Sequence, residues 1–248
     1  IPKIPAASVS IEDSLLIQRL SDAGEKVQVE LFMEAEMHPP VKSANVIAEI
    51  VGREKPEEVV VVGGHLDSWD VGQGAHDDGA GVMASLEAVI LMKKLGLRPR
   101  RTVRVVLFTN EENGLAGGKA YREYIGAAVK NHVAAIEMDG GAERPVGFGL
   151  GGGDPKQVAL LKEIGKLLDG IEAGNITLGG GGADISPIMN DGVPGLGLLT
   201  VGEHYFDWHH THADTLDKVN PTEFKKCTAA LAVMTYVLAD MPGKLKDQ

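Results

Sequence analysis

The chain contains a single cysteine, Cys227, among its 248 residues, so it can form no internal disulfide bond. One thiol also argues against a zinc site built from cysteines, and its position in a predicted helix favours a buried, unreactive side chain. Basic residues are scarce, with 24 Lys and Arg against 35 Asp and Glu, which gives a formal net charge of −11. An acidic chain without basic runs argues against nucleic acid or an anionic membrane as a partner.

Several sequence signatures are missing as well. No apolar run reaches the length of a membrane-spanning helix. The absence of a G-x-S-x-G motif argues against a serine hydrolase, and the absence of G-x-x-x-x-G-K-[ST] argues against a nucleotide-binding loop. The chain begins at Ile1 rather than Met, so we expect a fragment or a processed form whose signal peptide would be out of view.

Apolar residues and glycines are plentiful. The apolar fraction is 44%, which excludes a disordered chain, and the length suits one large α/β domain with or without a small appendage. Many of the 32 glycines are clustered, at 63–64, 140–141, 151–153 and 179–182. Such clusters predict tight turns where the backbone approaches a site closely.

The N-terminal part of the chain predicts a helix followed by an antiparallel hairpin. Ser10 precedes a short helix that reaches Leu20. Apolar residues alternate along Lys26–Ala35 and again along Ala44–Val51. We therefore expect these two segments to pair as strands around a loop at Pro39 and Pro40.

Strands and helices alternate through the rest of the chain. Val59–Val62 is a continuous apolar run, as in strands that are covered on both faces. Further strands are expected at 102–108, 132–138, 171–178 and 195–199, and helices at 82–93, 115–124, 155–168 and 221–239. The pattern predicts an α/β fold with three layers, in which a mostly parallel mixed sheet is covered by helices on both faces. Ligands bind beyond the carboxyl ends of the strands in such sheets.

Acidic residues and histidines follow several of these strands or lie in nearby loops. They are His65, Asp77, Asp78, Glu111, Glu112, Asp139, His209, His210 and His212. Nitrogen and oxygen donors of this kind form metal sites, and the number of carboxylates is sufficient for two ions. The residue types alone leave open which of the three C-terminal imidazoles would bind.

Each candidate also has a structural explanation. His65 could be an ordinary hydrogen-bonded histidine, although Asp67 could supply the acceptor that a metal-bound imidazole needs for its other nitrogen. Asp77 and Asp78 could form a solvated acidic turn, but adjacent carboxylates repel each other unless a cation or a proton intervenes.

The same two explanations apply to the later candidates. Glu111 and Glu112 could start a helix, or they could provide the general base and the metal ligand of a metallohydrolase. Asp139 could cap a turn before the two following glycines. His38 and His132 fit surface or structural positions better than a metal site.

Five motifs, in this order along the chain, resemble those of a known family: G-H-L-D-S, G-A-x-D-D-G-A-G, N-E-E-x-G, E-M-D and H-H-T-H-A-D-T. The family is that of the co-catalytic zinc aminopeptidases and glutamate carboxypeptidases, and the chain is most similar to its plasma glutamate carboxypeptidase branch. The resemblance implies a zinc exopeptidase-like catalytic domain over residues 36–248. Residues 1–35 resemble the end of a protease-associated domain and a connecting strand.

The resemblance also implies two Zn²⁺ ions and five ligands. His65 and Asp139 would hold one ion, and Glu112 and His210 would hold the other. Asp77 would bridge the two. His210 is chosen among its neighbours because the family ligand opens a string of the form H-T/S-x-x-D-T.

Other residues receive roles from the same resemblance. Glu111 would be the general base, and Asp67 would orient the first zinc-binding histidine. Asp78 would support the turn after the bridging aspartate. His209, where many relatives have Tyr, would stabilise the oxyanion or contact the substrate. Asp184, after the Gly179–Gly182 run, would contact a substrate amino group or cap a helix.

The implied activity is that of a metal-dependent exopeptidase that hydrolyses dipeptides or short peptides through a zinc-bridging water. Two alternatives remain open, an aminopeptidase on longer peptides and a non-catalytic, receptor-like domain of the same fold. The resemblance further implies a peptide substrate, a homodimer and a secreted or periplasmic location.

Overall fold

The computed structural model describes residues 4–34, 36 and 38–247. The chain separates into two units, residues 1–42 and residues 43–248. The first unit contains the predicted N-terminal helix, α1 (Ile11–Asp22). Ser10 caps this helix, because its hydroxyl accepts a hydrogen bond of 3.1 Å from the backbone N–H of Asp13.

The predicted N-terminal hairpin is wrong. Residues 26–34 form no strand, and Ala35 lies outside the described residues. The second predicted strand exists as β1 (Val46–Ile50), but it pairs antiparallel with β3 (Arg101–Phe108). Alternating apolar residues indicate a half-buried strand without indicating its partner. The edge of a larger sheet is the more stable partner, because a two-stranded hairpin covers little apolar surface.

The described part of the second unit is built on one seven-stranded sheet in the order β1-β3-β2-β4-β7-β5-β6. The other strands are β2 (Lys55–His65), β4 (His132–Glu137), β5 (Pro145–Gly151), β6 (Asn175–Leu178) and β7 (Gly195–Thr200). The β1–β3 and β5–β7 pairs are antiparallel and the other pairs are parallel. The predicted mostly parallel mixed sheet is therefore confirmed.

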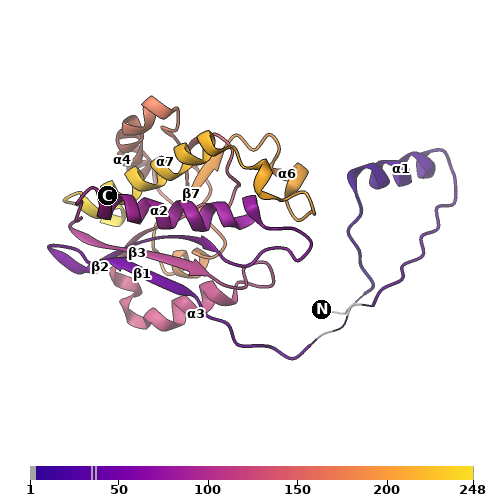
Figure 1. Ribbon diagram of the computed structural model, residues 1–248, viewed down its shortest axis with the longest axis horizontal. Coiled ribbons are helices and arrows are strands. Elements are labelled where there is room, and N and C mark those ends of the chain that lie inside the picture. Colours follow the sequence, from indigo (N-terminus) through magenta and orange to yellow (C-terminus); the bar gives the residue numbers. More distant parts are fainter. Residues whose placement is uncertain (1–3, 35, 37, 248) are drawn as a thin grey trace. The chain divides into compact units, whose positions relative to one another are not determined.

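Helices cover both faces of the sheet, as predicted. Figure 1 shows α2 (Ala80–Lys94) and α7 (Pro221–Asp240) on one face and α3 (Ala116–Ile125) on the other. The helix α4 (Pro155–Gly165) packs into the same apolar core as α2 and α7. Two short helices, α5 (Ser186–Met189) and α6 (Tyr205–Trp208), lie in the loops. Among the residues that the structure describes, no helix has the length and apolar character needed to cross a lipid bilayer.

The valines of β2 explain why this strand is central. Val60 and Val62 join the core under α2 and α7, whereas Val59 and Val61 join a second core with Tyr121 of α3. All four valines are buried, because successive side chains point to opposite faces and both faces are covered. The continuous apolar run therefore indicates a strand with a layer of helices on each face, which is the three-layer architecture.

The strand β5 has no counterpart among the predicted strands. Glycines alternate with Phe148 and Leu150 along it, and glycine is rare in strand interiors. A Cβ atom at Gly147 would lie 1.8 Å from the carbonyl oxygen of Asn175, and one at Gly149 would lie 2.2 Å from that of Gly179. The glycines are needed because the backbone of the neighbouring segment passes this close.

His132 is a structural histidine, as predicted, and its burial links folding stability to pH. Its Nδ1 donates to the carbonyl oxygen of Ala128 at 3.0 Å, and its Nε2 accepts from the hydroxyl of Tyr121 at 2.8 Å. Burial lowers the pKa of His132 from 6.5 to about 4. The unfolded chain therefore binds this proton more readily than the folded chain, and stability is lost as pH falls from 6.5 towards 4.

We expect the protonation of His132 to lower the free energy of unfolding by roughly 3 kcal/mol as pH falls from 6.5 to about 4. Urea unfolding at a series of pH values measures the slope of the free energy of unfolding against pH. In His132→Asn the slope should flatten, because the titrating group is gone. The exposed His38 provides the matched control, and His38→Asn should keep the wild-type slope. An unchanged slope in His132→Asn would contradict the assignment.

Candidate metal centre

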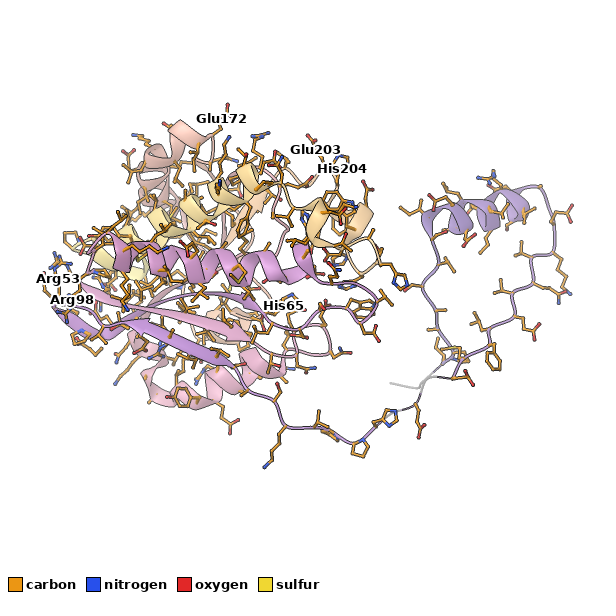
Figure 2. All side chains as sticks on the ribbon, in the orientation of Figure 1. Arg53, His65, Arg98, Glu172, Glu203 and His204 are labelled. Atoms are coloured by element: carbon orange, nitrogen blue, oxygen red, sulfur yellow. The ribbon has the colours of Figure 1, made fainter. Side chains whose placement is uncertain are left out.

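The carboxyl ends of three parallel strands carry the first group of candidate residues. His65 is the last residue of β2, Glu111 and Glu112 lie in the turn after β3, and Asp139 follows β4. The register pairs His65 with Phe108 at the end of β3, so the ends of these strands lie side by side. Figure 2 shows His65 towards the opposite end of the sheet from Arg53.

The turn Ala75–Gly79, directly before α2, carries Asp77 and Asp78, and the peptide bond between them is cis. Both side chains are buried. Asp214 holds the turn from another loop, because its carboxylate accepts hydrogen bonds from the backbone N–H groups of His76 at 2.7 Å and Asp77 at 3.1 Å. Asp214 was not among the predicted site residues, although it is the aspartate of the H-H-T-H-A-D-T motif.

Asp78 turns its carboxylate towards the backbone. One oxygen accepts from the N–H of His65 at 2.9 Å and the other from the N–H of Gly81 at 3.0 Å. A Cβ atom at Gly64 would lie 2.1 Å from Asp78 Oδ2, so glycine is required beside this side chain. Asp78 therefore links the end of β2 to the beginning of α2.

Asp67 contacts both His65 and the Glu111–Glu112 turn. Its main-chain carbonyl accepts from His65 Nδ1 at 2.8 Å, whereas its carboxylate lies 3.8 Å from the same nitrogen. The carboxylate accepts from the backbone N–H groups of Glu111 at 3.0 Å and Glu112 at 3.2 Å. Because Nδ1 donates to the carbonyl, Nε2 of His65 is the nitrogen left for a ligand.

Asp77 lies at the centre of two groups of donor atoms. His65 Nε2 is 3.1 Å from Asp77 Oδ1 and 3.3 Å from Asp139 Oδ1. His210 Nε2 is 3.2 Å from Asp77 Oδ2 and 2.9 Å from Glu112 Oε2. The two carboxylate oxygens of Asp77 therefore face two different imidazoles, each with a further carboxylate.

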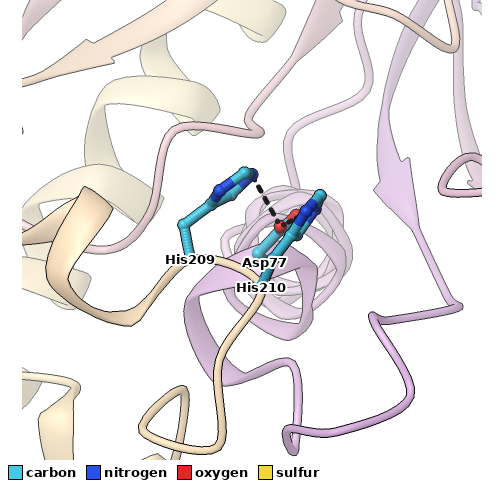
Figure 3. Close-up of side chains that lie close together, drawn as sticks. All are labelled: Asp77, His209 and His210. Atoms are coloured by element: carbon cyan, nitrogen blue, oxygen red, sulfur yellow. Dashed lines mark ion pairs between the residues drawn. The ribbon is translucent and has the colours of Figure 1, made fainter. Parts of the chain in front are cut away.

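His209 and His210 both lie beside the carboxylate of Asp77 (Figure 3). His209 Nε2 is 3.3 Å from Asp77 Oδ2, and the two imidazoles stack with ring centroids 3.7 Å apart. On its other face, His210 stacks on Trp69 at 4.4 Å with an interplanar angle of 9°. His210 is thus held between two rings, which restricts its orientation. His212 is not part of the three groups of close donor atoms found among the described residues.

The electrostatics of this cluster favour cations. Burial raises the pKa of Asp139 and of Glu112. Burial opposes the protonation of His65, but the carboxylates of Asp139 and Asp77 outweigh it and raise the pKa of His65 to about 12. Asp77 Oδ2, Glu112 Oε1 and Asp139 Oδ1 are buried and accept no hydrogen bond.

Buried carboxylate oxygens that accept no hydrogen bond are costly unless a cation is nearby. The donor set combines imidazole nitrogens with carboxylate oxygens and contains no sulfur. Zinc accepts both donor types, and catalytic zinc sites commonly have three protein ligands. The residues therefore fit a metal-binding site that can hold zinc.

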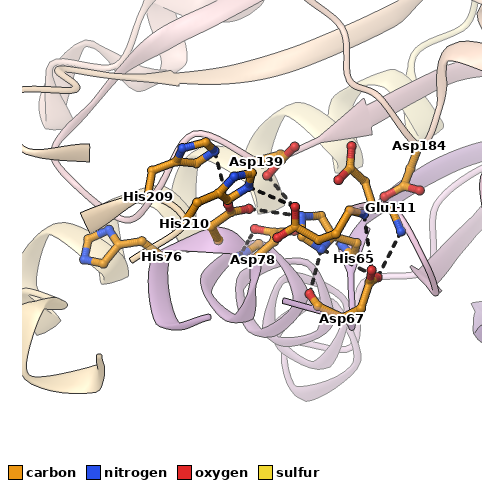
Figure 4. Close-up of polar contacts among 12 residues, drawn as sticks. His65, Asp67, His76, Asp78, Glu111, Asp139, Asp184, His209 and His210 are labelled. Carbon is orange, nitrogen blue, oxygen red and sulfur yellow. Dashed lines mark hydrogen bonds and ion pairs between the residues drawn. The ribbon is translucent and has the colours of Figure 1, made fainter. Parts of the chain in front are cut away.

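Glu111 stands apart from this donor set. Its side chain belongs to none of the three groups of close donor atoms in the described chain. Figure 4 shows Glu111 and Asp184 on the same side of His65. Burial raises the pKa of Glu111, and the carboxylates of Asp139 and Glu112 act in the same direction.

Asp184 is buried, and neither of its carboxylate oxygens has a hydrogen-bond partner. No side chain caps the short helix α5 that follows, so Asp184 does not act as its cap. Burial and the nearby carboxylate of Glu137 raise the pKa of Asp184 to about 8. An unpartnered carboxylate of this kind is available to a ligand.

Glu137 was missed by the sequence predictions. It is fully buried at the end of β4, and its carboxylate accepts from the backbone N–H groups of Asp184 at 3.4 Å and Ile185 at 3.0 Å. A Cβ atom at Gly182 would lie 2.2 Å from the carboxyl carbon of Glu137, which explains one glycine of the 179–182 run. The sequence signal that could have identified Glu137 is its position as a charged residue at the end of an apolar strand.

Comparisons with known proteins agree with the motifs. Residues 45–235 match the model of peptidase family M28. Carboxypeptidase Q of Bos taurus is 42% identical over 245 residues, which cover 99% of this chain and 52% of the relative. The Mus musculus protein is 43% identical with the same coverage. The predicted likeness to the plasma glutamate carboxypeptidase branch is confirmed, and the chain spans about half the length of the curated relatives it matches.

Solved structures share the fold. A peptidase M28 precursor from Shewanella amazonensis SB2B is 38% identical with a TM-score of 0.76, and the match covers 81% of this chain and 45% of that one. An aminopeptidase from Aneurinibacillus sp. strain AM-1 is 25% identical with a TM-score of 0.66, and the match covers 81% of this chain and 49% of that one. The predicted zinc exopeptidase-like fold is confirmed by these likenesses.

Proposed function

The chain belongs to peptidase family M28, and on this premise we propose that it is a di-zinc exopeptidase acting on dipeptides or short peptides. The observation that carries the proposal is the position of Asp77, whose two oxygens each face an imidazole and a second carboxylate. The names of the relatives, carboxypeptidase Q and aminopeptidase, support peptide hydrolysis at a chain end.

In this proposal five side chains hold the two zinc ions. His65 and Asp139 bind one ion, Glu112 and His210 bind the other, and Asp77 binds both. Zinc bound by these residues would lower the pKa of a water molecule and polarise the scissile carbonyl. Asp67 and Asp78 hold the ligands in place through the backbone contacts described above.

Glu111 is the general base of the proposed reaction. Its carboxylate takes the proton of the attacking water and then passes it to the leaving amine. Two observations support the role, its separation from the donor groups and the raised pKa that burial causes. A base with a raised pKa holds the proton more readily between the two transfers. The backbone contact with Asp67 keeps this side chain beside the metal ligands.

His209 and Asp184 are proposed to contact the substrate. His209 Nε2 lies 3.3 Å from Asp77 Oδ2, beside the proposed ligand His210, where it can donate a hydrogen bond to the developing oxyanion. Asp184 has two unpartnered carboxylate oxygens that can accept hydrogen bonds from a substrate amino group. Both contacts would orient the substrate rather than bind metal.

The proposal extends to the setting of the enzyme. The family resemblance supports a homodimer and a secreted or periplasmic location. A second candidate activity is aminopeptidase action on longer peptides, which the likeness to the Aneurinibacillus aminopeptidase favours. A receptor-like domain is the least favoured reading, because all five proposed ligands are present and close together.

Two measurements on the purified chain test the proposal. Zinc titration of metal-free protein should show two tightly bound equivalents, and a receptor-like domain would bind fewer. Hydrolysis of a dipeptide should exceed that of an amino-acid p-nitroanilide, because a dipeptidase requires the free carboxyl terminus that the anilide lacks. Faster anilide hydrolysis would favour the aminopeptidase alternative, and no hydrolysis of either by zinc-loaded protein would contradict the exopeptidase assignment.

A further inference from the structure

His76 lies beside Asp77 in the acidic turn, yet it is not one of the proposed ligands. It is 1% exposed, and its Nδ1 accepts a hydrogen bond of 3.1 Å from the backbone N–H of Ala142. Because Nδ1 is an acceptor here, the ring proton resides on Nε2. Nε2 is buried and has no hydrogen-bond partner, so the ring makes one directed polar contact, the one with Ala142.

Ala142 belongs to the loop that carries Asp139. Gly141 in this loop has a positive φ of 71°, and a Cβ atom there would lie 2.9 Å from His76 Nδ1 and 2.7 Å from Tyr205 Cδ2. The loop thus passes between His76 and Tyr205 without room for a side chain. The hydrogen bond to His76 therefore fixes a backbone position three residues after Asp139.

The other contacts of His76 reach the loop that carries His210. Its ring centroid is 4.5 Å from that of Trp208, and its backbone N–H donates to Asp214 at 2.7 Å. These residues lie on either side of His210 in the sequence. His76 therefore contacts both the loop of Asp139 and the loop of His210, but only the Asp139 loop is held through Nδ1.

We propose that His76 is a positioning residue that sets the spacing between Asp77 and Asp139, and thereby the zinc affinity of the His65–Asp77–Asp139 site. The inference rests on the two-zinc site proposed above. If His76 only filled space in the core, its role would depend on the volume of its ring and not on the acceptor nitrogen Nδ1. The two explanations predict different behaviour for variants that keep one property and lose the other.

Three variants separate these properties. His76→Phe keeps the ring and removes the acceptor, and His76→Leu is a second acceptor-free variant in case the first fails to fold. His76→Asn keeps an acceptor near the position of Nδ1 and removes the ring. The metal-free proteins are titrated with zinc against a competing chromophoric chelator, and thermal unfolding of each metal-free protein reports its folding.

In His76→Phe, the affinity for one zinc equivalent should fall by about 10- to 100-fold, the usual effect of removing a residue that supports a metal ligand. The other equivalent should bind as in the wild type, because Asp77, Glu112 and His210 keep their contacts. Excess zinc should restore the activity of this variant. His76→Asn should bind both equivalents with nearly the affinity of the wild type, whatever it loses in thermal stability.

Three results would overturn the inference. They are unchanged binding of both equivalents in the acceptor-free variants, an equal loss at both sites, and an equal loss in His76→Asn and His76→Phe. Each would leave the two-zinc proposal intact. If the wild type itself bound fewer than two equivalents, the proposed function would fail and this inference with it, so the two failures are distinguishable.

Discussion

Replacing Glu111 with alanine is expected to lower kcat by at least ~100-fold while both zinc equivalents stay bound. General acid–base catalysis contributes about 10²- to 10⁴-fold to rates, and Glu111 is a carboxylate near the donor groups that does not join them. Turnover of a dipeptide and zinc content, measured on the same preparation, check both parts of this expectation. Glu123→Ala, at an exposed glutamate of α3, is the control and should leave both values unchanged.

The pH profile gives an independent check on Glu111. A general base works only when it is deprotonated, so kcat/KM should fall on the acidic side as pH drops through the pKa of this group. Because burial raises the pKa of Glu111, this limb should lie above the range of an ordinary glutamate. Glu111→Ala should lack the limb. Retained turnover in the variant would remove Glu111 from the role, and loss of one zinc would make it a ligand.

Replacing Asp77 with asparagine should abolish activity and weaken both zinc sites at once. The two oxygens of Asp77 face the two imidazoles separately, and an amide has one oxygen and no negative charge. A ligand bound at 100 times its dissociation constant stabilises a protein by about 2.7 kcal/mol. The rise in Tm that zinc produces in the wild type should therefore disappear in Asp77→Asn.

Thermal unfolding with and without zinc, together with a chelator-competition titration, measures this effect. Asp70→Asn is the matched control, because Asp70 is an exposed aspartate in the loop between β2 and the acidic turn. Loss of one equivalent with full retention of the other would show that Asp77 serves a single ion. Two tightly bound equivalents in Asp77→Asn would remove the bridging role altogether.

The fold was predictable wherever a pattern along the chain has a local physical cause. The apolar run at Val59–Val62 predicted a strand that is covered on both faces, and the structure confirms it. The N-terminal hairpin failed because alternation does not identify the partner strand, and β1 pairs with β3 instead. The strand β5 was not predicted, because its glycines are required by the close approach of the backbone at and after β6. The residues next to β5 in the sequence give no sign of that approach.

The candidate site divides in the same way. The motifs pointed to His65, Asp77 and the other proposed ligands because donor types at strand ends are visible in the chain itself. The role of Glu137 could not be predicted, because its hydrogen-bond partners are the backbone N–H groups of a loop about fifty residues away in the sequence. The carboxylate contacts of Asp67 were also unforeseen, since they join it to the Glu111–Glu112 turn rather than to its near neighbour.

The sequence by itself determined the chemistry available to this protein, namely imidazoles and carboxylates at the ends of covered strands, together with its family and its layered fold. These properties follow from local side-chain chemistry and from periodic burial. Only the tertiary structure decided which atoms face one another, that the two oxygens of Asp77 diverge and that His76 fixes the loop of Asp139. The reason is that strand register and loop packing bring together residues from distant parts of the chain, and a distance of a few ångströms between donor atoms depends on that register.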